Sequence, residues 1–263
     1  MCNIKSRNCL ITGAAGGIGL ILAETFSKAG FTVIATDIAP KPPNLICHHY
    51  IEADLCRVAS EQKYAEDIFT KIHQCLDDTG LIALINNAAV QVIEGTENLS
   101  RDSWYQTLGI NLLAPFFLAQ EFLSELEAVN GCIINISSVH AHQTKRKFVS
   151  YATSKAALSG LTRAMAVDLA GRIRVVAIEP AAIETDMLKA GFFNNPEGYE
   201  QLNKLHPIGR IGHPSEVARL ALLIVDGGVN FLNGVCISMD GGVGAVLVDP
   251  DIKNIERSSI KKK

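Results

Sequence analysis

The chain has 263 residues, a formal net charge of −3, 48% hydrophobic residues and 19% charged residues, a balance that excludes disorder over most of its length and is typical of one substantial core. The small net charge gives no basic field for nucleic acid, and the cationic run at the C-terminus is too short to supply one. Apolar runs fall short of the roughly 20 residues that span a bilayer, so we expect neither nucleic acid nor membrane as a partner.

Seven cysteines are scattered along the chain without any C-x-x-C pair. An odd number with irregular spacing predicts neither a disulfide framework nor a zinc ribbon. The first residues have no long apolar core before a small-residue cleavage site. These features favour a reducing, cytoplasmic setting.

Short apolar runs alternate with longer amphipathic segments along most of the chain. The short runs are nearly continuous in apolar residues, as expected of parallel strands buried on both faces. They cover residues 8–13, 32–37, 81–89, 131–138, 173–180 and 234–242. Between them apolar residues recur every three or four positions, and we expect continuous helices over 57–76 and 103–126 among others. The pattern predicts a single α/β domain with a doubly wound, mostly parallel sheet of about seven strands and helices on both faces.

Two segments interrupt the alternation. Residues 38–45 contain three prolines, which leave little room for a helix between the second and third strands. Residues 183–208 form a long connection that mixes helix formers with Gly, Asn and Pro. Because this connection follows the carboxyl end of a strand, where ligands bind in such sheets, we expect it to act as a substrate lid.

Glycines mark the turn after the first strand, where TGAAGGIG places Gly13, Gly17 and Gly19 at a strand-to-helix junction. Glycine lets the backbone approach a pyrophosphate closely, and the amino end of the helix offers free N–H groups and a positive partial charge. The alternative is a tight turn that only packs the helix against the strand.

Asp37 ends the second strand, where a carboxylate can accept hydrogen bonds from a ribose diol. The same carboxylate would repel a 2′-phosphate, and neither Ala14, Ala15 nor Ile38 supplies a compensating cation, although Lys41 lies nearby in the sequence. The pattern therefore favours NAD as the cofactor. An ordinary strand-end turn residue is the alternative role for Asp37.

The motifs TGAAGGIG, NNAA and YATSK, together with Asn111 and Ser138, occur in a recognisable order and spacing. In this respect the chain resembles the classical short-chain dehydrogenases/reductases over about residues 7–242. The resemblance implies a Rossmann-type dinucleotide-binding catalytic domain over residues 1–242 and a C-terminal extension over 243–263 that is partly disordered or lies at an interface. It also implies that the cofactor contacts Gly13, Gly17, Ile18, Gly19, Asp37, Asp54, Leu55, Asn87, Ala88, Tyr151, Lys155, Pro180, Ile183 and Thr185.

The resemblance further implies a catalytic set. Tyr151 would be the proton donor or acceptor, and Lys155 its electrostatic helper and a ribose ligand. Ser138 would orient the substrate, and Asn111 would anchor a proton-relay water. Physical chemistry supports the pair of Tyr151 and Lys155, which lie four residues apart on a predicted helix, because an ammonium beside a phenol lowers the pKa of the phenol toward neutrality. The alternatives are an exposed helical face for this pair and, for Asn111, a buried amide that satisfies backbone groups near Gly109.

Other polar residues of the same stretch have more ordinary interpretations. Successive strand side chains point to opposite faces, so only one of Ser137 and Ser138 faces the crevice, and the resemblance favours Ser138. His140 and His142 lack a third ligand at a recognisable spacing, so we expect no metal site. The basic residues 145–147 are expected to form a solvated turn, with attraction of an acidic substrate group as the alternative.

Two residues depart from the family pattern after the sixth strand. Ala181 replaces a glycine that lies near the nicotinamide, which is tolerable where the backbone angle suits alanine. Glu179 replaces a small residue just before Pro180. Its carboxylate would favour cationic or hydroxyl-rich ligands near the cleft, or it would point away into a salt bridge.

These observations predict an NAD-dependent oxidoreductase that interconverts a secondary alcohol and a ketone, on a small hydroxylated substrate resembling a sugar or polyol. The alternatives are a reductase of 3-oxoacyl thioesters and a non-catalytic NAD-binding protein on the same fold. By resemblance we expect a homodimer or a homotetramer.

Overall fold

The computed structural model describes residues 7–76, 79–192 and 194–247. Within them seven parallel strands form one sheet in the order β3-β2-β1-β4-β5-β6-β7. The strands are β1 (Asn8–Thr12), β2 (Thr32–Asp37), β3 (His49–Glu52), β4 (Leu81–Asn86), β5 (Cys132–Ile136), β6 (Arg174–Pro180) and β7 (Cys236–Met239). The order reverses between β1 and β4, which is the topological switch point where ligands bind in doubly wound sheets. The predicted doubly wound, Rossmann-type fold is confirmed.

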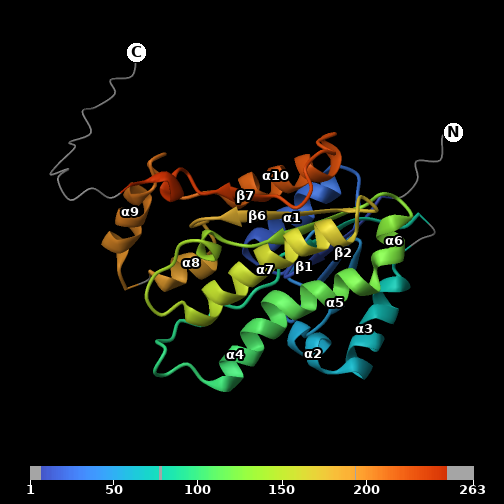
Figure 1. The fold of residues 1–263 in the computed structure, drawn as a ribbon, viewed down its shortest axis with the longest axis horizontal. Coiled ribbons are helices and arrows are strands. Elements are labelled where there is room, and N and C mark those ends of the chain that lie inside the picture. Colours follow the sequence, from blue (N-terminus) through green and yellow to red (C-terminus); the bar gives the residue numbers. More distant parts are fainter. Residues whose placement is uncertain (1–6, 77–78, 193, 248–263) are drawn as a thin grey trace, which may run out of the picture.

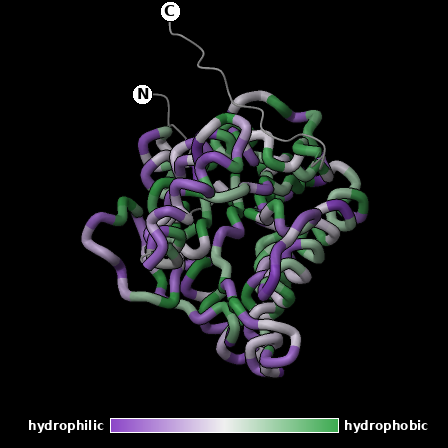
Figure 2. Tube along the Cα trace, turned by 90° about the vertical axis from the view of Figure 1, so that its left-hand side faces the viewer, coloured by the Kyte–Doolittle hydropathy of each residue, from purple (hydrophilic) through white to green (hydrophobic). Residues whose placement is uncertain are grey.

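Helices cover both faces of the sheet. On one face α1 (Gly17–Lys28) and α10 (Pro214–Asp226) pack on the strands and on each other, with Leu22 and Phe26 of α1 fully buried. Figure 1 shows α10 above the strands and α3, α5 and α7 below them. Hydrophobic stretches run mainly through the interior of the molecule, and hydrophilic stretches lie mostly at its periphery (Figure 2).

The second face carries most of the remaining helices. A separate apolar core forms there between the sheet and residues of α2, α3, α5, α6 and α7. These helices and their neighbour α4 are α2 (Leu55–Ser60), α3 (Gln62–His73), α4 (Arg101–Leu108), α5 (Ala114–Glu121), α6 (Leu123–Glu127) and α7 (Val149–Asp168). Strands buried from both sides explain why their sequences are almost continuously apolar.

The predicted continuous helices over 57–76 and 103–126 are wrong in detail. The first is broken at Glu61, whose extended backbone separates α2 from α3. The second contains a π-helical turn, Gly109–Leu113, between α4 and α5, and it is interrupted again at Phe122 before α6. Hydrophobic periodicity does not reveal such breaks because the apolar face continues across them. The expected absence of a helix in residues 38–45 is confirmed.

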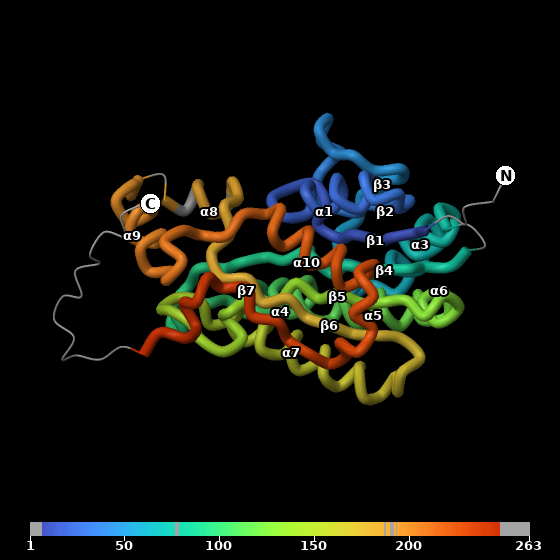
Figure 3. The backbone as a smooth tube through the Cα atoms, turned by 90° about the horizontal axis from the view of Figure 1, so that it is seen from above, coloured from blue at the N-terminus to red at the C-terminus, as the bar shows by residue number. Residues whose placement is uncertain are grey.

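The long connection after β6 contains α8 (Asp186–Gly191) and α9 (Pro196–Leu205). Both helices lie at one end of the molecule, opposite α3 and α6 (Figures 1 and 3). In the part of the chain that the structure describes, no helix is long and apolar enough to cross a membrane. The predicted C-terminal extension falls mostly on residues 248–263, which lie outside the described residues.

Candidate active site

The predicted site residues gather at the carboxyl edge of the sheet. The glycine turn follows β1, Asp37 ends β2, Asp54 follows β3 and Asn87 follows β4. Ser138 follows β5, whereas Pro180 ends β6. All these positions share one edge because the strands are parallel, and they flank the switch point between β1 and β4.

The turn after β1 requires glycine at two positions. Gly13 has a φ of 64°, and a Cβ atom there would lie 2.6 Å from the Cα of Ala88. A Cβ atom on Gly19 would lie 2.0 Å from the carbonyl oxygen of Gly13. Both contacts are with backbone atoms, so a side chain at either position would force the turn apart.

Side chains from β1 and the end of β4 hold this turn in place. The amide of Asn87 donates to the carbonyl oxygens of Thr12 (3.0 Å) and Gly13 (2.9 Å). The Thr12 hydroxyl accepts from the backbone N–H groups of Asn87 (3.1 Å) and Ala88 (3.0 Å). Asn87 thus has a visible structural role, and Thr12 is a supporting residue that sequence reasoning missed because a threonine ending a strand is ordinary.

The residues around the turn fit a dinucleotide. The residue before helix α1, Gly16, is its N-cap and offers no side chain to bind the first N–H groups. A Cβ atom on Gly16 would meet no atom of another residue beyond its chain neighbours within 4 Å. An uncapped helix amino end beside open space suits a pyrophosphate. Asp37 lies against the same turn and accepts hydrogen bonds from the N–H groups of Ala15 (2.9 Å) and Ala39 (3.1 Å).

Asp54 and Leu55 open helix α2. One carboxylate oxygen of Asp54 accepts from the N–H of Cys56 at 2.8 Å, so the side chain caps the helix, and Leu55 is buried in the core. Their expected contact with the cofactor stays a prediction.

Ser138 and Tyr151 form the centre of the predicted catalytic set. Ser138 is 6% exposed, and its hydroxyl lies within hydrogen-bonding reach of the Tyr151 phenol. The same hydroxyl accepts from the N–H of His140 (3.2 Å) and points toward the carbonyl oxygen of Pro180 (3.4 Å). The neighbouring Ser137 turns to α7, where it contacts the carbonyl oxygen of Lys155 at 3.0 Å. The two serines therefore face different surroundings, as the alternation of strand side chains requires.

Lys155 is almost completely buried beside Tyr151. Its Nζ donates to the carbonyl oxygen of Ile136 at 2.7 Å and lies 5.7 Å from the centroid of the Tyr151 ring. Burial lowers the pKa of Lys155 to about 7, because the charged ammonium loses its water.

The expected lowering of the Tyr151 pKa is wrong for the protein without cofactor. Burial raises the pKa of the half-buried phenol above its ordinary value, and the hydrogen bond with Ser138 offsets this rise only in part. Only a fully charged Lys155 would lower the Tyr151 pKa strongly. The same burial that surrounds Tyr151 weakens the charge of its neighbour near neutral pH.

Asn111 occupies the π-helical turn between α4 and α5 and is fully buried. Its side chain accepts from the N–H of Val90 (2.8 Å) and donates to the carbonyl oxygen of the same residue (2.9 Å). The amide also donates to the Ser154 hydroxyl at 3.0 Å. The predicted alternative, a buried amide satisfying backbone groups, is present, although the partner is Val90 and not the region of Gly109. The relay-water role stays a prediction.

His140 lies against Tyr151. Its ring stacks on Phe148 with 4.6 Å between centroids and meets Tyr151 edge-on at 5.5 Å. Burial, assisted by the nearby Lys145 charge, lowers the pKa of His140 to about 4, so the imidazole is neutral at physiological pH. No group of three or more potential metal ligands occurs among the residues that the structure describes.

The segment after β6 lies against the glycine turn. A Cβ atom on Gly17 would lie 3.1 Å from a side-chain carbon of Thr185, and Ile183 is buried in the core on the α1 and α10 face. Among the described non-glycine residues, a left-handed backbone occurs at Asn130, Lys147 and Ala170, and Ala181 is not one of them. Ala181 therefore keeps an angle that alanine tolerates, as expected.

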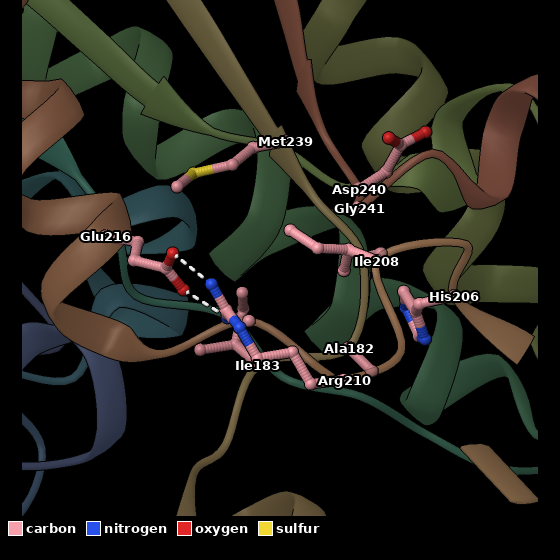
Figure 4. A pocket seen from close by; sticks show the side chains of 11 residues that line it. Ala182, Ile183, His206, Ile208, Arg210, Glu216, Met239, Asp240 and Gly241 are labelled. Atoms are coloured by element: carbon pink, nitrogen blue, oxygen red, sulfur yellow. Dashed lines mark hydrogen bonds and ion pairs between the residues drawn. The ribbon is translucent and has the colours of Figure 1, made fainter. Parts of the chain in front are cut away.

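A small hollow of about 80 Å³ is lined in part by this segment (Figure 4). Ile183, Ile208 and Met239 contribute apolar side chains to it, and the ion pair of Arg210 and Glu216 lies at its edge. Its lining residues come from the segment directly after β6, from residues 206–216 and from the end of β7.

Comparison with known proteins finds relatives that match almost the whole chain. A family model described as enoyl-(acyl carrier protein) reductase matches residues 13–244. An NAD-dependent glycerol dehydrogenase from Listeria innocua is 32% identical over 248 residues, which cover 91% of this chain and 94% of the relative.

Two solved structures share the fold over almost the whole chain. The ligand-free aldohexose dehydrogenase of Thermoplasma acidophilum superposes with a TM-score of 0.83 at 26% identity, covering 94% of this chain and 98% of the other. A gluconate 5-dehydrogenase from Burkholderia cenocepacia, in complex with NADP and tartrate, gives a TM-score of 0.80 at 26% identity, covering 92% and 96%. The chain therefore belongs to the short-chain dehydrogenase/reductase family of NAD(P)-dependent oxidoreductases.

Proposed function

We propose that the protein interconverts a secondary alcohol and a ketone with NAD, using Tyr151 as the acid and base. The observation that carries this proposal is the grouping of three side chains: the Ser138 hydroxyl lies within hydrogen-bonding reach of the Tyr151 phenol, and the buried Lys155 Nζ lies 5.7 Å from the centroid of the Tyr151 ring. A proton donor, an orienting hydroxyl and a cation are the groups that carbonyl reduction requires.

Each residue has a distinct part in the reaction. NAD(P), when bound, accepts or supplies the hydride at the substrate carbon. Tyr151 gives its phenolic proton to the carbonyl oxygen in reduction and takes the hydroxyl proton in oxidation. Ser138 donates a hydrogen bond to the same oxygen as its negative charge grows, and Lys155 stabilises the phenolate that remains. The raised pKa of Tyr151 keeps the phenol protonated at neutral pH before cofactor binds, which suits the acid role.

We infer that NAD is preferred over NADP. Asp37 presents a carboxylate at the end of β2 that would hydrogen-bond a ribose diol and repel a 2′-phosphate. Its fixed position, with hydrogen bonds to Ala15 and Ala39, supports this inference. The described relatives include both an NAD-dependent enzyme and a complex with NADP, so the preference rests on Asp37.

The substrate class that we propose is a small hydroxylated molecule such as a sugar or polyol. The names of the glycerol, aldohexose and gluconate dehydrogenases support this class. The matching family model supports an acyl thioester as the second candidate. We propose that residues 183–208 act as a lid over either substrate, with Phe192 and Tyr199 in edge-on contact at 5.8 Å.

We also propose a homo-oligomer in a cytoplasmic setting. Apolar side chains stay exposed on α4, on the π-helical turn and on α5, at Tyr105 (70% exposed), Leu113 (41%) and Phe116 (37%), which suits burial against a second copy. Light scattering should give a dimer or a tetramer, and a monomer would contradict the proposal. The cytoplasmic location remains a prediction from the scattered cysteines.

A substrate panel tests the proposed reaction directly. Sugars, polyols, hydroxy acids and 3-oxoacyl thioesters would each be assayed with NAD and with NADP by absorbance of the reduced cofactor. Turnover of a polyol or sugar with NAD is the expected result, whereas turnover restricted to thioesters would favour the second candidate. Binding of NAD without turnover of any compound would support a non-catalytic protein.

Tyr151→Phe should lower kcat by roughly 10²–10⁴-fold, because the acid and base of the reaction is removed while the ring remains. NAD affinity and thermal unfolding should change little. Tyr105→Phe is the matched control because this tyrosine is exposed on α4. Wild-type turnover in Tyr151→Phe would overturn the assignment.

A further inference from the structure

Glu179 is a buried carboxylate that the proposed reaction does not use. It lies on β6 directly before Pro180 and is 1% exposed. Removing a carboxylate from water costs several kcal/mol unless hydrogen bonds or an opposite charge replace the water. The groups that contact the Glu179 carboxylate therefore indicate what it does at this position.

The two oxygens of Glu179 contact two different segments. Oε1 accepts from the Ser159 hydroxyl of α7 at 2.7 Å, and Oε2 meets Nε2 of His142 at 2.9 Å. Ser159 in turn contacts the hydroxyl of Ser137 at 2.8 Å. One side of the carboxylate thus belongs to a buried hydroxyl network beside Lys155, and the other side reaches a histidine that is 55% exposed.

His142 belongs to the segment that we name the substrate loop, residues 139–148, between Ser138 and α7. His140 of the same loop donates its backbone N–H to the Ser138 hydroxyl, and its ring meets the ring of Tyr151 edge-on. A second attachment is made by Gln143, whose amide donates to the carbonyl oxygen of Gly244 at 3.2 Å. Between these attachments and Phe148 the loop carries three exposed basic residues, 145–147, and a left-handed backbone at Lys147.

We propose that the pair of His142 and Glu179 is a latch that holds the substrate loop over the active site, so that Glu179 is a positioning residue. The carboxylate is fixed from inside by Ser159 and cannot follow the loop, so the loop is ordered when His142 binds it. The ordered loop places His140 beside Tyr151, and substrate binding therefore depends on the latch. The effect on substrate binding rests on the proposed function, whereas the attachment of the substrate loop by His142 and Glu179 does not.

Limited trypsin digestion tests the latch without any assay of activity. Trypsin cleaves after Lys145, Arg146 and Lys147, and cleavage at these sites follows the population of the opened loop when closing is fast. His142→Ala should raise the initial rate of cleavage at residues 145–147 about tenfold, measured by mass spectrometry of the fragments. The matched control is His73→Ala, because His73 also pairs with carboxylates, those of Glu121 and Glu125, but at the far end of the molecule (Figures 1 and 3).

Steady-state kinetics on the best substrate of the panel tests the second step. His142→Ala should raise KM for that substrate about tenfold and leave kcat and the KM for NAD within about twofold, a division that a general loss of stability does not produce. Glu179→Gln, which keeps the shape but not the charge, should have a similar effect, and the double variant should add little to either. His142→Gln, which retains a donor, should recover part of the wild-type KM.

Specific outcomes would overturn the proposal. Unchanged cleavage at 145–147 in His142→Ala, or an equal increase in His73→Ala, would exclude the latch. Additive effects of His142→Ala and Glu179→Gln on KM would show that the two residues act independently. If no compound of the panel is turned over, the proposed function fails, whereas the digestion still decides whether the loop is held.

Discussion

The two halves of the sheet build the site by different means. The half formed by β1 to β4 presents a backbone turn, since Gly13 and Gly19 admit no side chain, and the side chains of Thr12 and Asn87 hold that turn in place. The half formed by β5 to β7 relies on buried polar side chains, among them Ser137, Ser159 and Lys155. A backbone turn restricts the residue type at only a few positions, those that need glycine. A network of buried side chains is stable only when every polar group in it has a hydrogen-bond partner.

This difference explains what each half contributes. Backbone N–H groups and a helix amino end recognise a pyrophosphate, which is common to every dinucleotide. In the proposed reaction the chemistry falls to side chains that change protonation. Their pKa values depend on burial, as those of Tyr151 and Lys155 do. We therefore expect substitutions in the first half to act on folding and cofactor choice, and those in the second half to act on pH dependence and substrate binding.

Gly13→Ala should produce the largest loss of stability. The new Cβ would lie 2.6 Å from the Cα of Ala88 and would sit on a left-handed backbone, so we expect a loss of about 2–4 kcal/mol in the free energy of unfolding. Gly16→Ala is the matched control, because its Cβ would meet nothing within 4 Å. Urea unfolding of the protein without cofactor measures both, and equal losses would show that the turn does not depend on close packing.

Asp37→Asn should change cofactor choice. The amide keeps much of the shape but removes the charge that would repel a 2′-phosphate, so the ratio of kcat/KM for NAD to that for NADP should fall by roughly 10–100-fold. Asp67→Asn, on the exposed surface of α3, is the control for a simple change of net charge. A wild-type preference for NADP would refute the role of Asp37 before any variant is made.

The sequence allowed more of the first half to be predicted than of the second. Strand alternation, the glycine turn and Asp37 are local patterns whose physical reasons can be stated from a few residues. Ser159 and Thr12 could not be found in this way, because each matters only through partners brought close by the fold. Glu179 was noticeable as a charge where a small residue is usual, but its partner His142 lies 37 residues earlier in the chain. The sign of the Tyr151 pKa shift was missed because burial of the pair cannot be read from spacing.

Lys155→Met should alter how stability depends on pH. Burial lowers the Lys155 pKa to about 7 in the folded protein, from 10.5 for a free lysine. At a pH between these two pKa values the unfolded chain binds more protons than the folded protein, so the free energy of unfolding rises with pH. From pH 7.5 to 9 the wild type should gain up to about 2 kcal/mol in the free energy of unfolding relative to Lys155→Met. Lys71→Met, which changes an exposed lysine, should follow the wild-type curve. Parallel curves for wild type and Lys155→Met would mean that Lys155 stays fully charged when buried.

Glu216→Gln should have the smallest effect, because this residue lies outside the buried network. Its carboxylate accepts from the N–H of His213 at 2.8 Å, which caps α10, and from Arg210 at 2.7 Å. Arg210, followed by the His213 N–H, lowers the Glu216 pKa to about 2. The stabilisation is therefore present above the unfolded pKa and is lost as pH falls from about 4.5 toward 2. Since both side chains are partly exposed, solvent screens the pair, and we expect Tm at pH 7 to fall by only roughly 2–4 °C. Near pH 2.5 the difference from wild type should shrink, and a drop in Tm that persists there would mean that the glutamate acts through packing and not through its charge.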